Sequence, residues 1–354
     1  MNRIIPHSRP TIGAEEAEAV KRVVLSGHLA QGEEVGGFEE EVAAFAGRRY
    51  AVAVSSGTAA LHLALLALDV GEGGEVLIPS YVCTALLHAI RSAGGKPVVV
   101  DIDGQTRNID SGDASRRWGA SGGAMIVPHM FGLPAHMDEL AKLGVPIIED
   151  CAMAIGASYQ GRRVGSFGDL SICSFYATKM LTAGGEGGMV LTDSTDLVER
   201  VRGLREYDGL PADFLRFNYK MTDVAATMGR VQFKRLPAFI ERRREIAAHY
   251  DRSFVNLPLD CPLQEPEHIY YRYVIRTARE AGVLIGQLER NGVAARRPIY
   301  QPLHRELGEE DAVYPQTGAA FKADVSLPIY PSQSDAEVEQ VIKAVVHTLG
   351  SPTE

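Results

Sequence analysis

Lys179 is the residue of this sequence with the clearest chemical potential. It follows the apolar run DLSICSFY, which starts at Asp169, and precedes the glycine-rich segment AGGEGG at residues 183–188. A lysine amine that lies near another cation and is partly removed from water has a lowered pKa, and the neutral amine can form an imine with an aldehyde. Most lysines are solvated surface charges, so Lys179 gains this role only together with the motifs that follow.

Asp150 ends the apolar segment VPIIED, which starts at Val145, and lies 29 residues before Lys179. An unpaired charge is costly to bury, so a carboxylate at the end of a buried strand needs a partner. A protonated pyridine nitrogen would serve, and the carboxylate would keep such a ring a strong electron sink. A salt bridge to an arginine, or a cap on the next helix, fits the sequence alone equally well.

The residues Ser56, Gly57 and Thr58 interrupt the segment AVAVSSGTAALHLAL at residues 51–65. A buried strand there gives way at once to a helix, which gathers free backbone N–H groups, hydroxyls and the positive end of a helix dipole. This combination suits a phosphate group. An ordinary helix-capping turn without a ligand fits the same residues.

A fourth stretch, FNYKMTDVAATMGRVQ at residues 217–232, places Asn218, Tyr219 and Lys220 directly before a helical pattern. Taken alone, these residues indicate only the polar start of an ordinary helix.

Alternating apolar runs and helical patterns must position these groups. The runs YAVAV, EVLIP, KPVVVDID, GAMIVPH, VPIIED, DLSICSFY and GGMVLTD start at Tyr50, Glu75, Lys96, Gly123, Val145, Asp169 and Gly187. They are continuously apolar, as strands buried on both faces are, and the helices between them predict a mostly parallel α/β sheet covered on both sides. Ligands of such sheets bind beyond the carboxyl ends of the strands, where the residues above would meet.

The pattern changes from about Arg235. A charged helix, FIERRREIAAHY from Phe239, leads into a segment richer in Pro and Tyr, and a last helix is expected near residues 336–349. A chain of 354 residues is longer than one compact core usually holds. We therefore expect a large domain over residues 1–235, including the N-terminal segment, and a smaller C-terminal α+β domain over residues 236–354.

Charge and composition exclude several classes of protein. The net charge of -9 and the pI of about 5.6 argue against a nucleic-acid surface or a basic membrane patch. The N-terminus MNRIIPHSRP lacks the apolar core of a signal peptide, so we expect a cytoplasmic protein without a membrane span. The cysteines have no metal-ligand spacing, which predicts no metal site and small buried side chains at Cys83, Cys151, Cys173 and Cys261.

The chain resembles the DegT/DnrJ/EryC1/StrS family of nucleotide-sugar aminotransferases, which depend on pyridoxal 5'-phosphate (PLP). The resemblance rests on motifs in the right order along nearly the whole chain: RPTIGAEEAEAVKRVVLSGHLAQG, SSGTAALHLALLALDVGEGGEVLIPSY, PVVVDID, IIEDCAMAIGASYQGRRVGSFGD, SFYATKMLTAGGEGGMVLTD, NYKMTDVAATMG and VSLPIYPS. It implies the type I PLP-dependent transferase fold, as in aspartate aminotransferase. It also implies a homodimer whose active sites lie at the subunit interface.

The resemblance assigns roles to individual residues. Lys179 would hold PLP as a Schiff base and act as the acid and base of the proton transfer, and Asp150 would pair with the pyridine nitrogen. The phosphate would be held by Ser56, Gly57, Thr58 and Ser174, together with Asn218 of the partner subunit. The implied reaction moves an amino group from glutamate to a keto sugar carried on a nucleotide diphosphate, by a ping-pong route through pyridoxamine phosphate.

Three positions near the expected cofactor depart from the family pattern. Met153 stands where a glutamine is usual, Cys83 where an aromatic residue commonly stacks on the ring, and Met180 where an asparagine follows the lysine. Met153 and Cys83 remain expected cofactor-facing residues. Because these two residues differ from the family pattern, the sequence is compatible with more than one substrate.

The segment RRPIYQPLH at residues 296–304 corresponds to a substrate loop of the family. Arg296 or Arg297 would meet a diphosphate or the donor's carboxylate, and Tyr300 and His304 would contact the substrate. Surface charges and a loop histidine packed on Tyr300 explain the same residues without a ligand.

Three other functions remain compatible with the sequence. The acceptor could be a ketone without a nucleotide, such as a cyclitol or a small metabolite. A PLP-dependent sugar dehydratase is less favoured, because Lys179 is present and the cysteines lack iron–sulfur spacing. The third is a non-catalytic regulator of the same fold.

Overall fold

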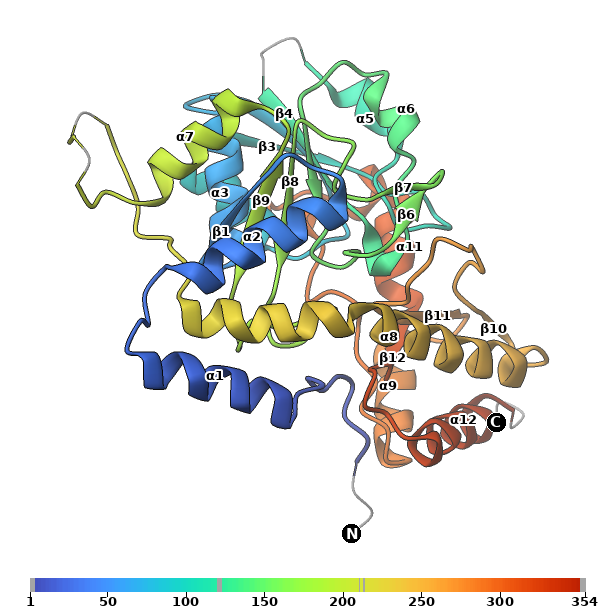
Figure 1. Cartoon of the computed structure of the whole chain (residues 1–354). Helices are drawn as coiled ribbons and strands as arrows, with labels where there is room; N and C mark the ends of the chain where they lie inside the picture. The colour runs from blue at the N-terminus through green and yellow to red at the C-terminus, as the bar shows by residue number, and fades with distance from the viewer. Residues whose placement is uncertain (1–3, 120–122, 210, 213, 351–354) are drawn as a thin grey trace.

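The computed structural model describes residues 4–119, 123–209, 211–212 and 214–350, and its centre is a seven-stranded sheet (Figure 1). The strand order is β1-β9-β8-β5-β4-β2-β3. The strands are β1 Tyr50–Val54, β2 Glu75–Pro79, β3 Lys96–Val100, β4 Gly123–Pro128, β5 Ile147–Asp150, β8 Leu170–Ser174 and β9 Gly188–Thr192. Strand β9 is antiparallel to both its neighbours and the other pairs are parallel, which confirms the predicted mostly parallel α/β sheet. Each predicted apolar run forms one strand.

Helices cover both faces of this sheet, because each strand is apolar on both sides. Val52 and Val54 of β1 pack in one core with the helices α3, α4 and α7, whereas Ala51 and Ala53 point into the opposite core with α2 and α8. Near β3 and β4, helices α5 and α6 extend this second layer. The helices are α2 Glu33–Ala46, α3 Gly57–Ala67, α4 Ala85–Ser92, α5 Ser111–Arg117, α6 Met137–Ala141, α7 Thr195–Arg205 and α8 Asp223–Phe254.

The C-terminal part has a core of its own around a three-stranded antiparallel sheet. This sheet has the order β10-β11-β12, and its elements with the packed helices are β10 Leu259–Asp260, β11 Tyr273–Thr277, β12 Asp324–Leu327, α9 Ala281–Arg290 and α12 Asp335–Gly350. The remaining elements are α1 Ala14–Ser26, the hairpin β6 Ser158–Tyr159 and β7 Arg162–Arg163, α10 Leu303–Glu306, α11 Pro315–Ala323 and the short 3-10 turns Met130–Gly132 and Asp311–Val313.

Two features connect the C-terminal part to the rest of the chain. Helix α8 runs without a break across residue 235 and contributes Ile246, Tyr250 and Phe254 to the C-terminal core. In Figure 1 the same helix lies below the large sheet and continues to the C-terminal strands. Ile5, from the N-terminal segment, is buried in this core and pairs with Val293. Because α8 and the N-terminal segment both contribute to the C-terminal core, the division of the chain into two domains at residue 235 remains a prediction.

In the part of the chain that the structure describes, we find no helix with the length and apolar character needed to cross a membrane.

Candidate active site

The carboxyl ends of β1, β5 and β8 border a cavity of about 460 Å³. Nine of the residues singled out from the sequence line it: Ser56, Gly57, Thr58, Cys83, Asp150, Met153, Ser174, Lys179 and Tyr300. They come from segments far apart in the chain, and they meet because parallel strands end at the same edge of the sheet. We call this space the lysine cavity.

The phosphate-like corner of the lysine cavity is built around Gly57, the first residue of α3. Ser56 caps the helix by accepting a hydrogen bond from the Ala59 N–H at 3.1 Å. A Cβ atom on residue 57 would lie 2.7 Å from Cβ and 2.9 Å from Oγ of Ser174, so only glycine lets the Ser174 hydroxyl approach the helix start. Thr58 is exposed beside it. A helix N-terminus with adjacent hydroxyls and no intervening side chain fits a phosphate group.

Asp150 is the last residue of β5 and is only 5% exposed. Its Oδ1 accepts a hydrogen bond from the Ala152 N–H at 2.9 Å. Burial raises the pKa of the Asp150 carboxyl, and the positive charge of Lys179 opposes that rise. Among the described residues no cation forms an ion pair with Asp150. A buried carboxylate without a cationic partner fits a ligand that brings its own positive charge, as a protonated pyridine ring does.

Lys179 reaches the cavity from a loop that backbone hydrogen bonds hold in place. The Ala177 N–H donates to the Gly185 carbonyl at 3.0 Å, and the Phe175 N–H donates to the Gly187 carbonyl at 2.9 Å. The loop can fold back on itself because Gly185 has a φ of 122°, a conformation that side chains disfavour. The loop thus presents Lys179 to the same cavity as Asp150.

Tyr271 and Arg272 line the lysine cavity from the C-terminal part, and the sequence analysis missed both. The Nζ atom of Lys179 lies 5.4 Å from the centre of the Tyr271 ring, and Arg272 Cζ lies 5.0 Å from the same centre. Burial acts to raise the pKa of the Tyr271 phenol, but the nearby charges of Lys179, Arg272 and Arg243 outweigh it and lower this pKa to about 8. The sequence offers one signal for these two residues, which is the aromatic and charged run YYRY at residues 270–273 that leads into an alternating strand.

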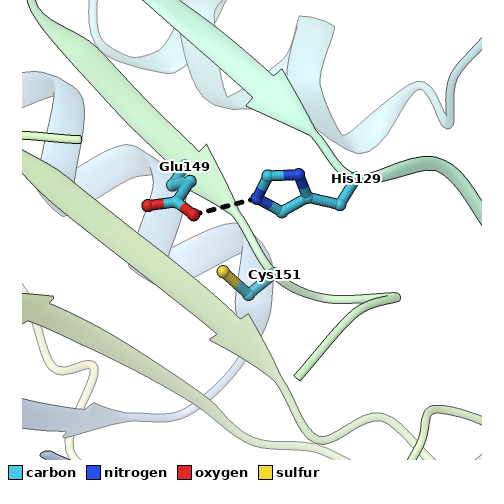
Figure 2. Close-up of side chains that lie close together, drawn as sticks. All are labelled: His129, Glu149 and Cys151. Carbon is cyan, nitrogen blue, oxygen red and sulfur yellow. Dashed lines mark hydrogen bonds and ion pairs between the residues drawn. The ribbon is translucent and has the colours of Figure 1, made fainter. Parts of the chain in front are cut away.

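A buried cluster next to Asp150 has the composition of a metal site, but the ligand atoms of its histidine and glutamate already form hydrogen bonds. Figure 2 shows His129, Glu149 and Cys151 pointing toward one another around the end of β5. The Glu149 carboxylate accepts hydrogen bonds from His129 Nε2 at 3.0 Å and from three backbone N–H groups, those of residues 165, 167 and 168. The other ring nitrogen of His129 accepts the Ala135 N–H at 3.0 Å, so the imidazole is neutral. We assign the cluster a structural role, which is to fix the strand that carries Asp150.

Three residues proposed for the substrate do not line the lysine cavity. The Arg297 guanidinium is an ion-pair partner of Glu280 and donates to the Phe321 carbonyl. Arg296 is exposed and lies 3.9 Å from Glu289. His304 is fully buried: its ring bonds to Ser80 at 2.6 Å and to Asp311 at 2.9 Å, and it stacks on Tyr314 rather than on Tyr300. Tyr300 does line the cavity and is 90% exposed.

The remaining predicted positions differ in their surroundings. Asn218 is exposed in the segment before α8, outside the lining of the lysine cavity. The prediction of four buried cysteines holds for Cys151 and Cys173, but Cys83 is exposed and Cys261 half-buried. Cys83 is exposed because the lysine cavity opens at this position.

Comparison with known proteins decides the family. The model of the DegT/DnrJ/EryC1/StrS aminotransferase family matches residues 10–346. The chain belongs to this family. It is a PLP-dependent aminotransferase with the α/β fold of its relatives.

Individual relatives match over nearly their full length. The spore coat polysaccharide biosynthesis protein SpsC of Bacillus subtilis is 35% identical, with 97% of each chain covered. The GDP-perosamine synthase of Escherichia coli O157:H7 is 32% identical, with 97% of this chain and 98% of the relative covered. The PLP form of Spr1654 from Streptococcus pneumoniae superimposes with a TM-score of 0.91 at 26% identity, with 98% of each chain covered.

Proposed function

We propose that this aminotransferase moves an amino group from glutamate to a keto sugar carried on a nucleotide diphosphate. The observation that carries the proposal is the meeting of Lys179, Asp150 and the Gly57–Ser174 corner in one cavity. A relative that makes a GDP-linked amino sugar supports the nucleotide sugar as acceptor.

The three groups match the three parts of the cofactor. When bound, PLP supplies an aldehyde that condenses with amines and a cationic ring that accepts the electron pair released at the donor carbon. The start of α3 and the Ser174 hydroxyl would hold the phosphate, and Asp150 would hold the proton on the ring nitrogen. Lys179 would reach the aldehyde end. Asn218 of the partner subunit would complete the phosphate site in a homodimer.

Lys179 would also carry the proton during transfer. Its Nζ would take the proton from the α-carbon of the donor and pass it to the cofactor carbon that bears the nitrogen, and in the second half it would move a proton from there to the sugar carbon that receives the amine. The carboxylate of Asp150 would stay ionised in both halves, because it would pair with the protonated ring nitrogen. The apolar wall that includes Ile172 and Ile299 would limit the access of water.

Borohydride reduction of the cofactor-loaded protein tests this assignment. We expect the reduced cofactor on a single peptide that contains Lys179, located by mass spectrometry. Incubation with glutamate before reduction should prevent the labelling, because the amino group then occupies the cofactor. A label on another lysine would contradict the role of Lys179.

A substrate screen tests the reaction itself. Purified protein would be incubated with amino donors and with keto sugars linked to GDP, UDP or dTDP, and the products identified by mass spectrometry. We expect an aminated product when glutamate is combined with at least one nucleotide-linked keto sugar. Turnover with free ketones alone would contradict the proposed acceptor.

A further inference from the structure

The charges around the lysine cavity leave one cation for the substrate. Of the described residues in its lining, Lys179 and Arg272 are the only two with a positive charge. The proposed function assigns Lys179 to the cofactor and to proton transfer. Arg272 is therefore the cation that remains available to an anionic group of a substrate.

Arg272 differs from Arg107, Arg276 and Arg297 in lacking an acidic partner. Arg107 and Arg276 both pair with the buried Asp324, at 2.7 and 3.2 Å, and Arg297 pairs with Glu280. Within the described part of the chain, no carboxylate pairs with Arg272, although the side chain is half-buried. A guanidinium in such a position favours binding a carboxylate or a phosphate, which it can contact through two parallel N–H groups.

Two contacts hold the Arg272 guanidinium in place. Its Nη1 lies 2.7 Å from Nδ1 and 2.9 Å from Nε2 of His7, and the same Nε2 lies 2.9 Å from the Ser326 hydroxyl. Burial, followed by the charges of Arg272 and Arg296, lowers the pKa of His7 to about 3. His7 is therefore neutral and accepts the hydrogen bond. The guanidinium also lies over the Tyr271 ring, with Cζ 5.0 Å from the ring centre, so the group is oriented before any ligand arrives.

The distance from Lys179 allows a group on the reacting carbon to contact Arg272. Lys179 Nζ and Arg272 Cζ lie 5.4 and 5.0 Å from the same Tyr271 ring centre, so the two cannot be farther apart than these distances combined. An amino acid carries its carboxylate on the carbon that reacts beside Lys179. The diphosphate of a nucleotide sugar is separated from the reacting carbon by the sugar ring.

We propose that Arg272 binds a carboxylate of the amino donor and makes this enzyme selective for amino acids. The proposal rests on the proposed function, because it concerns the donor of that reaction. It replaces the assignment of the donor carboxylate to Arg296 or Arg297.

Binding of glutarate to the PLP-loaded protein tests the proposal without turnover. Glutarate has the two carboxylates of glutamate but no amine, so it cannot react. We expect Arg272→Gln to weaken glutarate binding, measured by calorimetry, by about 10- to 100-fold, the range for a lost charged hydrogen bond. Arg272→Lys should weaken glutarate binding less, because a lysine keeps the positive charge but cannot form the two parallel hydrogen bonds of a guanidinium. The matched control Arg290→Gln, at an exposed position at the end of α9, should bind as the unchanged protein does.

The separate half-reactions identify the source of the carboxylate. In Arg272→Gln, the KM for glutamate should rise by a similar factor, whereas the reaction of the amino form of the cofactor with the keto sugar nucleotide should keep its KM. A primary amine without a carboxylate should react equally well with both proteins. The proposal would be overturned if Arg272→Gln changed the KM only in the keto sugar half-reaction. It would also be overturned if glutarate did not bind, or bound both proteins with equal affinity. If glutarate binding depends on Arg272 but glutamate never aminates the cofactor, the proposed function fails and the carboxylate site stands.

Discussion

At the scale of single residues, the lysine cavity depends on charges kept apart from one another. Asp150 is buried on the sheet side, and Lys179 and Arg272 approach from a loop and from the C-terminal part. This arrangement leaves the carboxylate free for a cationic ligand, because no described side chain pairs with it.

Substitution of Asp150 by asparagine tests the role of this carboxylate. The variant removes the charge that holds the ring nitrogen protonated, while the amide can still accept the Ala152 N–H. We expect the protein to fold and bind PLP but to lose about 100-fold or more in kcat, the usual size of a lost electrostatic contribution to the transition state. Steady-state kinetics and the cofactor absorbance measure the two effects, and near-normal turnover would refute the role.

A single methyl group at residue 57 should disrupt the phosphate corner. In Gly57→Ala the new Cβ would lie 2.7 Å from the Ser174 Cβ, so either the helix start or Ser174 must move. We expect PLP affinity to fall by at least about 10-fold, because the phosphate loses aligned donors. Titration of the cofactor-free protein with PLP measures this loss.

Gly36→Ala is the matched control for this variant. Residue 36 lies inside α2, and a Cβ there would meet no atom within 4 Å. The substitution should therefore leave PLP affinity unchanged and stabilise the helix by about 0.5–1 kcal/mol. Equal loss of PLP affinity in both variants would show that the effect is not specific to the phosphate corner.

At the scale of elements, the strand ends are held by the buried cluster of His129 and Glu149. The Glu149 carboxylate is 0% exposed and connects the end of β4 to the turn at residues 165–168. Four donors converge on it, so the two strands and the turn are fixed relative to one another. Asp150, the next residue in β5, takes its position from this arrangement.

Glu149→Gln should destabilise the fold. A glutamine offers one oxygen and one N–H₂ group, so backbone N–H groups that now point at the carboxylate would be left unpaired. We expect a loss of about 3 kcal/mol in the free energy of unfolding, because each buried N–H group left unpaired costs about 1–3 kcal/mol. Denaturant titration measures it, and a change below about 1 kcal/mol would contradict the bracing role.

The same variant has a defined pH dependence. Burial acts to raise the pKa of Glu149, but the hydrogen bonds, with that of His129 first among them, lower it below its ordinary value of 4.5. A carboxyl with a lowered folded-state pKa contributes stability above its unfolded pKa and loses it as the pH falls through the folded value. The difference in stability between the two proteins should therefore shrink on acidification below about pH 4.5.

The sheet, and the residues that line the cavity at the strand ends, were predicted from the sequence, whereas Tyr271 and Arg272 were not. Continuous apolar runs identify buried parallel strands, and Asp150 and Lys179 follow two of them. Arg272 and Tyr271 reach the cavity because the segment before β11 packs against the core of the large sheet, which no local pattern records. Arg297 and His304 looked available in the sequence, but Glu280, Asp311 and Ser80 satisfy them.

At the scale of the whole molecule, the proposed shared active site makes a prediction for mixed subunits. Lys179→Ala and Asn218→Ala should each be nearly inactive alone. If Asn218 acts in the neighbouring subunit's site, co-refolding the two variants should restore activity, since a mixed dimer holds one site with both native residues. Random pairing gives roughly a quarter of the native activity. Activity that stays at the level of the separate variants would contradict the shared site.

The contacts of the N-terminal segment have a practical consequence for preparing the protein. Ile5 is packed in the core of the C-terminal part, and His7 is the acceptor that orients Arg272. A recombinant protein that begins at residue 11 would still contain every motif of the large sheet, so its sequence alone would give no sign of a defect. It would nevertheless expose apolar surface next to Val293 and free the guanidinium to rotate. Recombinant versions should therefore carry these first residues, with any affinity tag joined through a spacer long enough to leave them docked.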